Sequence, residues 1–257
     1  MVDRKSAAVA LEVVALVGLW ELAVSGLHLA NPAFVPPPSR VWAAFTTMLA
    51  DGSLAGHAWF STQNAVAGFL LAVVTGIGAG LALGTSRLVS DIAGPPFWTA
   101  YAMPRIAFQP LLVLWLGFGA APKILIIFLM AVFPVAINTM DGIRAVDRSL
   151  VRAARVYGAS RMEVFFKVQL WAALPMILTG VRMGVARAMV GIVVGEFIGG
   201  SQGLGYLIFR RSADFDLASA LALTLSLVVI ANLLMALVSL VRRLVAPWFS
   251  ESQGVFS

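Results

Sequence analysis

Six apolar runs of about 20 residues each limit this chain more than any other feature. A bilayer offers no partner for a free backbone N–H or C=O group, so runs of this length are predicted to form transmembrane helices. The expected fold class is therefore an all-α integral membrane protein with about six transmembrane helices. The six runs are Ala8–Leu29, Gln63–Thr85, Pro96–Phe118, Pro122–Asp141, Gly180–Gly199 and Ser219–Val241.

The composition supports a lipid environment. Hydrophobic residues make up 60% of the chain and charged residues 12%, against roughly 45–50% and about 25% in soluble domains. The chain has no cysteine, which excludes disulfides and thiolate metal sites. Its net charge of +6 lies between the apolar runs rather than in one basic groove, so no nucleic-acid partner is expected.

The first run has a second interpretation, as a cleaved secretory signal, because Ala23-Val24-Ser25 resembles a cleavage site. The run is too long for a signal, and Glu12 and Glu21 interrupt it. A retained first span is the favoured interpretation.

Basic residues predict the orientation. With a cytoplasmic N-terminus, eleven of the 18 Lys and Arg residues fall in inner segments, namely 1–7, 86–95, 142–179 and 242–257. Three fall in the outer segments 30–62, 119–121 and 200–218. Positive charge concentrates on the cytoplasmic side of membrane proteins. We therefore expect a multi-pass membrane protein with both termini in the cytoplasm.

The chain is predicted to have three parts. Residues 1–62 hold the first span and an external Pro-rich segment, in which Ser39 is expected to cap a short interfacial helix. Residues 63–241 hold a core of about five spans, and residues 242–257 form a cytoplasmic tail. No internal repeat is visible, which disfavours folds built from inverted halves.

One inner segment, residues 142–179, holds six of the 18 basic residues. Asp147 can cap a helix that runs to Tyr157, and Gly158 can end that helix in a left-handed conformation. Ser160 and Glu163 match a capping box that starts a second helix.

Two signals complete this segment, and they leave two interpretations open. Small residues near the turn (Ala153, Ala154 and Ala159) would let a partner approach closely, and Pro175 is expected to close the segment before the fifth span. A rigid helix–turn–helix that docks a soluble partner is one interpretation. An amphipathic loop lying on anionic lipid is the other.

The segment resembles the cytoplasmic coupling loop of permeases from binding-protein-dependent ABC importers. That pattern has Glu-Ala-Ala, then Gly, then Ile-x-Leu-Pro, and it falls on Arg152-Ala153-Ala154, Gly158 and Val168–Trp171. Arg152, Val168 and Trp171 depart from it. Further motifs resemble the nitrate/sulfonate/taurine branch: Pro36–Val41, Leu114–Gly119, Phe133-Pro134, Leu174-Pro175, Thr179-Gly180 with Arg182, Gly195-Glu196 and Ser201–Leu207.

The resemblance implies an ABC type I importer permease-like fold that works by alternating access. It implies a location in the bacterial inner (plasma) membrane. The partners it implies are a second permease copy, expected to be identical, two cytoplasmic ABC ATPase subunits and an external solute-binding protein. The chain has no Gly-Lys dipeptide and hence no phosphate-binding loop, so ATP and Mg are expected in the partner ATPase and no cofactor in this chain. The residues expected to couple to the ATPase are Arg152, Ala153, Ala154, Tyr157, Gly158, Ala159, Ser160 and Glu163.

The translocation pathway is predicted from polar residues at membrane depth, which are costly there and so often functional. The candidates are Met103, Arg105, Gln109, Asn138 and Glu196. Arg105 follows Pro104 in a run that must be kinked or broken. Glu196 could equally be a structural partner of Arg105 or Arg187, and Arg182 and Arg187 are expected to extend to the cytoplasmic edge.

Glycine spacings at Gly76–Gly84, Gly180–Gly184 and Gly191–Gly199 predict close helix packing, within the chain or between copies. Gly203 and Gly205 are predicted to form a turn rather than a dinucleotide fingerprint.

The sequence leaves the solute open among sulfonates, taurine, nitrate, bicarbonate and pyrimidine-like compounds. A transport subunit without catalytic residues is expected, and no metal site, because His28 and His57 stand far apart. The alternatives are an ion-coupled secondary transporter without an ATPase and an intramembrane enzyme.

Overall fold

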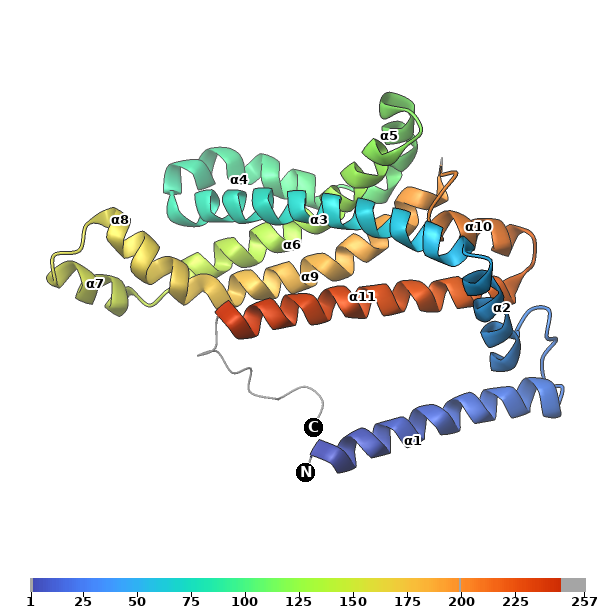
Figure 1. Ribbon diagram of the computed structural model, residues 1–257. Helices are drawn as coiled ribbons and strands as arrows, with labels where there is room; N and C mark the ends of the chain where they lie inside the picture. The colour runs from blue at the N-terminus through green and yellow to red at the C-terminus, as the bar shows by residue number, and fades with distance from the viewer. Residues whose placement is uncertain (1, 199, 246–257) are drawn as a thin grey trace. The chain divides into compact units, whose positions relative to one another are not determined.

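A computed structural model describes residues 2–198 and 200–245, and within these ranges the regular structure is entirely helical (Figure 1). Its α-helices are α1 (Val2–Glu21), α2 (Pro38–Ala50), α3 (Ser53–Thr85), α4 (Arg87–Ala102), α5 (Gln109–Leu116), α6 (Ala120–Arg144), α7 (Arg148–Val156), α8 (Arg161–Val164), α9 (Leu170–Phe197), α10 (Leu204–Ala213) and α11 (Leu217–Val245). Shorter elements are the π turns η1 (Leu22–Gly26) and η3 (Phe165–Gln169) and the 3-10 turn η2 (Arg105–Phe108).

The chain forms two compact units, each described here by itself. Unit 1 comprises Met1–Ser61 and Gly200–Val229, and unit 2 comprises Thr62–Gly199 and Ile230–Ser257. Four helical segments of the described residues are long and apolar enough to cross a membrane: Ser53–Thr85, Ala120–Arg144, Arg161–Phe197 and Leu217–Val245. They confirm the second, fourth and sixth predicted spans and, with an earlier start, the fifth, whose predicted last residue, Gly199, lies outside the described residues.

Two predicted spans differ from the structure. The run Pro96–Phe118 is not one helix: α4 ends at Ala102, and α5 starts at Gln109, with Pro110 in its first turn. This break confirms the predicted interruption of the third run. The run Ala8–Leu29 is shifted, because α1 starts at Val2 and ends at Glu21, where η1 follows.

The start of α9 is a further correction. Pro175 was expected to close the segment before the fifth span, but it lies inside α9, and α8, η3 and α9 continue one another as Arg161–Phe197. Proline is tolerated within transmembrane helices because neighbouring groups compensate for its missing N–H. The Thr179 Oγ1 donates to the Pro175 carbonyl at 2.9 Å in the next turn.

In unit 1, α2 begins with a cap that differs from the predicted one. Pro37 is its N-cap, and Ser39 lies inside the first turn, where its N–H donates to Glu21 Oε2 at 3.0 Å and its hydroxyl to Glu21 Oε1 at 2.9 Å. A carboxylate at a helix N-terminus satisfies amides that otherwise lack partners. Glu21, at the end of α1, therefore ties α2 to α1.

The predicted turn is confirmed at Gly203, whereas Gly205 lies inside α10. Gly203 adopts φ +117° as the N-cap of α10, a conformation that favours glycine. Its N–H donates to His57 Nδ1 at 2.9 Å, and the Leu204 N–H donates to Ser61 Oγ at 2.8 Å. Two side chains of α3 thus cap α10 within unit 1.

In unit 2, glycines let α3 and α9 approach α6 on their backbones. A Cβ added at Gly68 would lie 2.7 Å from the Ile124 carbonyl oxygen, and one at Gly76 would lie 2.9 Å from that of Val132. On α9, a Cβ at Gly191 would lie 2.8 Å from Ile127 Cα. The glycine spacings therefore form contacts within this chain, and we call the surfaces of α3, α6 and α9 that meet there the glycine seam.

Candidate functional site

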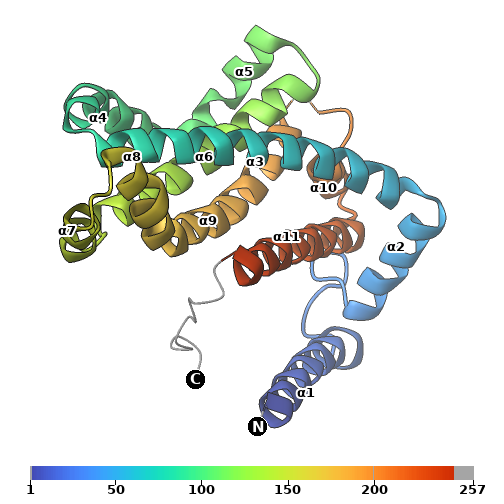
Figure 2. The ribbon, with the colours of Figure 1, turned by 60° about the vertical axis from the view of Figure 1, so that its left-hand side comes forward.

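The segment from Arg148 to Gln169, which we call the coupling element, consists of α7, a turn, α8 and η3. Figures 1 and 2 show α7 and α8 at one end of α6 and α9, whereas α5 lies at the other end. Its local structure agrees with the sequence. The Asp147 side chain accepts from the Ser149 N–H at 2.7 Å and caps α7, and this bond lowers the pKa of Asp147.

The turn after α7 depends on Gly158, whose φ is +86°. The Ala159 N–H donates to the Ala154 carbonyl at 3.0 Å, and the Gly158 N–H donates to the Arg155 carbonyl at 2.9 Å. These two bonds around a left-handed residue form a Schellman motif, which satisfies carbonyls at the helix end. The predicted stop at Gly158 is confirmed.

The capping box that starts α8 is also confirmed. Glu163 N–H donates to Ser160 Oγ at 3.3 Å, and Ser160 N–H donates to Glu163 Oε2 at 3.0 Å. Lys167 Nζ lies 3.0 Å from Glu163 Oε1. The backbone N–H of Ser160, followed by Lys167, lowers the pKa of Glu163 from 4.5 to about 2.

The base of the coupling element is buried, whereas its turn is open. Val164 is buried, and Val146, Phe165 and Leu170 pack against a core of Ile143, Ala173 and Ile177. In contrast, the side chains of Val156 and Tyr157 are 85% and 91% exposed. An apolar and an aromatic side chain this exposed at a rigid turn form the kind of surface that protein partners cover.

The predicted coupling residues lie together around this turn. Arg152, Ala153, Tyr157, Gly158, Ser160 and Glu163 are exposed, and Ala154 and Ala159 are partly buried. Their role toward an ATPase stays a prediction, because no partner is present in the structure.

The break between α4 and α5 places Arg105 on an aromatic surface. Its guanidinium carbon lies 5.3 Å from the centroid of the Tyr101 ring and 5.0 Å from that of Phe133, near the middle of α6. Its Nη2 donates to the Tyr101 carbonyl at 3.3 Å. Cation–π contacts of this kind hold a guanidinium while leaving most of its donors available.

A second cation, Arg187 of α9, lies close enough to act electrostatically on Arg105. One turn before it on α9, Met183 Sδ lies 3.6 Å from Asn138 Nδ2 of α6. Among the residues that the structure describes, neither Arg105 nor Arg187 forms an ion pair with a carboxylate. Of the predicted pathway residues, Met103 is exposed and Arg105 and Asn138 are partly buried.

Glu196 and Gln109 lie in the interior instead. Glu196 is buried, and it acts electrostatically on Lys123, a buried residue of α6. Gln109 is also buried, and its Nε2 donates to the Gly195 carbonyl at 3.1 Å. Glu196 thus acts on Lys123, whereas the electrostatic neighbours of Arg105 are Tyr101 and Arg187. Both Gln109 and Glu196 connect the end of α9 to neighbouring helices.

Lys123 was not identified from the sequence, and the helix that holds Arg187 is longer than predicted. Lys123 and Glu196 stand at the ends of two consecutive predicted spans joined at the opposite membrane face, so they share a depth and carry opposite charges. That signal could have paired them. The fifth span was predicted to start at Gly180, but the helix that holds Arg187 starts at Arg161.

Comparisons with known proteins agree with this architecture. Residues 68–251 match the family described as "Binding-protein-dependent transport system inner membrane component". The chain is 34% identical to the putative aliphatic sulfonates transport permease protein SsuC of Bacillus subtilis, over 93% of this chain and 86% of that protein. It is 35% identical to the taurine transport system permease protein TauC of Escherichia coli, over 90% and 86%.

Another relative is the riboflavin transport system permease protein RibX of Chloroflexus aurantiacus, which is 34% identical over 84% of this chain and 81% of that protein. Among solved structures, the fold resembles a chain of the inward-facing MetNI methionine ABC transporter, with a TM-score of 0.63 and 17% identity over 74% of this chain and 94% of that chain. Four membrane-length helices, a helical coupling element and these matches together lead to one assignment: the chain belongs to the family of inner membrane components of binding-protein-dependent transport systems.

Proposed function

We propose that this permease imports a small organic anion, with a sulfonate as the preferred class. Two of its relatives are named for aliphatic sulfonates and taurine. The observation that carries the proposal is the pair Arg105 and Arg187, two cations of unit 2 that lack a carboxylate partner among the described residues. Arg105 is partly buried and Arg187 is exposed, and a charge at membrane depth is costly unless a counter-charge arrives. An anionic solute supplies that counter-charge as it passes.

The surroundings of Arg105 suit an organic anion better than a bare inorganic one. Trp98, Tyr101 and Phe133 form a connected aromatic surface, with ring centroids 5.9 Å apart for the first pair and 5.7 Å for the second. Trp98 and Tyr101 are exposed. This surface would pack against the carbon skeleton while the guanidinium binds the sulfonate oxygens.

The proposal includes the partners that the family implies. Two ATPase subunits would bind the coupling element, a second permease copy would complete the pathway, and an external solute-binding protein would deliver the solute. ATP binding by the ATPases would move the coupling element and shift the pathway between two accessible states. In this arrangement the N- and C-termini lie in the cytoplasm.

Reconstitution of the permease with its ATPase and binding protein in proteoliposomes tests this function. Uptake of radiolabelled taurine or an alkanesulfonate should require ATP and should fall about tenfold or more in Arg105→Gln and in Arg187→Gln, because each removes a charge-assisted contact. Arg40→Gln, outside this pair, is the control and should transport normally.

Two outcomes would contradict the proposal. Uptake driven by an ion gradient without ATP would indicate a secondary transporter. The RibX relative is named for riboflavin. Riboflavin transport that needs neither arginine would indicate that the solute is a neutral heterocycle stacking on the aromatic surface, and not an anion.

A further inference from the structure

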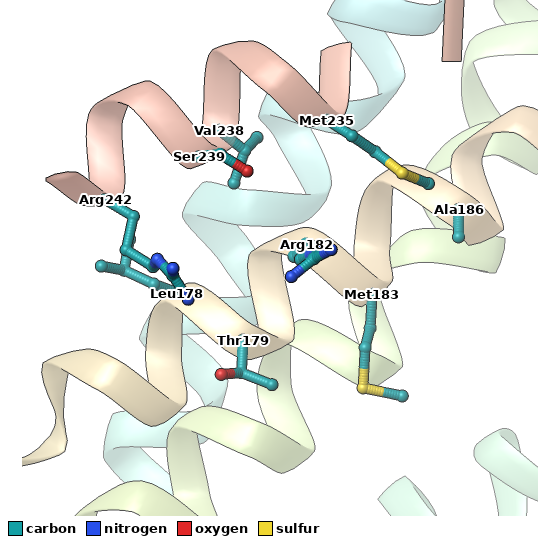
Figure 3. Close-up of a pocket in the computed structure, with 9 residues that line it drawn as sticks. All are labelled: Leu178, Thr179, Arg182, Met183, Ala186, Met235, Val238, Ser239 and Arg242. Carbon is teal, nitrogen blue, oxygen red and sulfur yellow. The ribbon is translucent and has the colours of Figure 1, made fainter. Parts of the chain in front are cut away.

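A second pair of arginines in unit 2 borders a cavity that the proposed pathway does not use. The cavity has a volume of about 310 Å³ and lies between α9 and the last turns of α11 (Figure 3). Its lining residues are Leu178, Thr179, Arg182, Met183, Ala186, Met235, Val238, Ser239 and Arg242. This volume is at the lower end of the range for small-ligand sites, which is about 300–1,000 Å³.

The polar part of the cavity is suited to an oxyanion. Figure 3 shows Arg182 on α9 and Arg242 on α11, with both side chains in the space between the two helices. Both arginines also interact within the chain, but a guanidinium carries five N–H donors and can serve several acceptors at once. Ser239 adds a hydroxyl, and none of the nine lining residues is acidic. The charge therefore favours an anion.

The remaining lining is apolar, and so is the adjacent surface. Leu178, Ala186, Met235 and Val238 form most of the wall. The turns of α11 beside the cavity also expose large aliphatic side chains, namely Leu237, Leu240, Val241 and Leu244. In a membrane protein such a surface faces lipid tails or another helix. The cavity thus combines an anion site with an apolar flank, which an inorganic anion would not use.

We propose that this cavity binds the phosphate headgroup of an anionic phospholipid, with the acyl chains along α11. Arg242 lies in the last turn of α11, where the helix ends and headgroups of a bilayer begin. Basic pockets between transmembrane helices are suited to anionic headgroups. The shared chemistry is an oxyanion on an apolar tail, so an alkanesulfonate solute is the competing source of the same contacts.

Native mass spectrometry of the permease–ATPase complex, solubilised gently from membranes that contain phosphatidylglycerol, tests the proposal. Wild type should retain phosphatidylglycerol, and Arg182→Gln and Arg242→Gln should each weaken its retention about fivefold, with a larger loss in the double variant. Arg243→Gln is the matched control, because Arg243 shares the last turn of α11 but does not line the cavity.

A cavity-filling variant, Ala186→Phe, tests the lipid site without changing its charge. It should also expel the lipid, while Arg182→Lys and Arg242→Lys should retain most of it. Equal lipid retention in wild type, the double Gln variant and Ala186→Phe would overturn the site.

Separate titrations of delipidated complex with phosphatidylglycerol, inorganic phosphate and decanesulfonate distinguish the sources. Arginine-dependent binding that is tightest for phosphatidylglycerol supports the proposal. Binding that is tightest for decanesulfonate or phosphate overturns the lipid assignment. None of these results depends on uptake, so the lipid site and the proposed function can fail separately.

Discussion

Along the glycine seam, helices pack closely because glycines have no side chains. The coupling element is instead stabilised by side chains that form hydrogen bonds with its own backbone. The seam buries α6 against α3 and α9 over their length, with carbonyl oxygens of α6 where a Cβ would otherwise stand. The coupling element instead has two caps and a Schellman turn on an exposed surface. The seam is therefore intolerant of added volume, and the coupling element is sensitive to backbone conformation and charge.

The largest effect is expected from Glu196→Gln, at the end of the seam. It leaves Lys123 as a buried charge without its partner, which should lower the free energy of unfolding by about 3–5 kcal/mol. Thermal melting of the solubilised permease measures this. The double variant Lys123→Met/Glu196→Met should recover most of the loss, and a double variant as unstable as the single one would contradict the pairing.

The next effect is expected from Gly80→Leu. A Cβ at Gly80 would collide with the Ala136 carbonyl oxygen and lie 2.6 Å from Thr139 Cβ, so the larger side chain should destabilise the fold by about 3 kcal/mol. Gly78→Leu is the matched control on the same helix, because an added Cβ there meets nothing within 4 Å. Equal melting temperatures for the two variants would show that the seam does not depend on glycine.

In the coupling element, Gly158→Pro should lower the free energy of unfolding by about 2 kcal/mol, because a hydrogen bond is lost and the backbone must change conformation. Proline cannot adopt φ +86° and has no N–H for the Arg155 carbonyl. ATP-driven uptake should fall at least about tenfold while the complex still hydrolyses ATP. Gly52→Pro is the control, because Gly52 has φ +76° on an exposed turn outside the coupling element. Normal uptake in Gly158→Pro would remove this turn from the transport mechanism.

The smallest effect concerns pH. Because the pKa of Glu163 is lowered from 4.5 to about 2, its stabilising contribution is fully present above pH 4.5 and is lost as the pH falls through about 2. The protection of the Ser160 amide against hydrogen exchange should decrease over this window in wild type. In Glu163→Ala, which has no side-chain acceptor, it should be low and independent of pH there. The global melting temperature should depend on the packing of the glycine seam and not on the protonation of Glu163.

Local structure could be predicted from the sequence because its signals lie within a few residues of one another. Asp147, Gly158 and the pair Ser160 and Glu163 each act on backbone groups one to four positions away, and all were correctly interpreted. The glycine spacings likewise predicted close packing. These features fix most of the fold of the coupling element and the presence of helix contacts, but not which helices meet.

The remaining features depend on contacts between distant residues or on context. Glu21 binds Ser39 across 18 positions, and Lys123 meets Glu196 only because α6 and α9 pack together. Pro175 reads as a helix end in water, yet it lies inside a helix here because membrane helices tolerate proline. That one misreading shortened the fifth span, which was predicted to start at Gly180 and lies in the helix Arg161–Phe197.

The length of α9, Leu170–Phe197, has a practical consequence for following the transport cycle. Trp171 and Phe197 lie near its two ends and are separated by about 39 Å at the standard rise per residue. Spectroscopic labels at these two positions would form an internal ruler of constant length against which the displacement of every other helix can be read. A change in that length during ATP turnover would indicate bending of α9 itself, at Pro175.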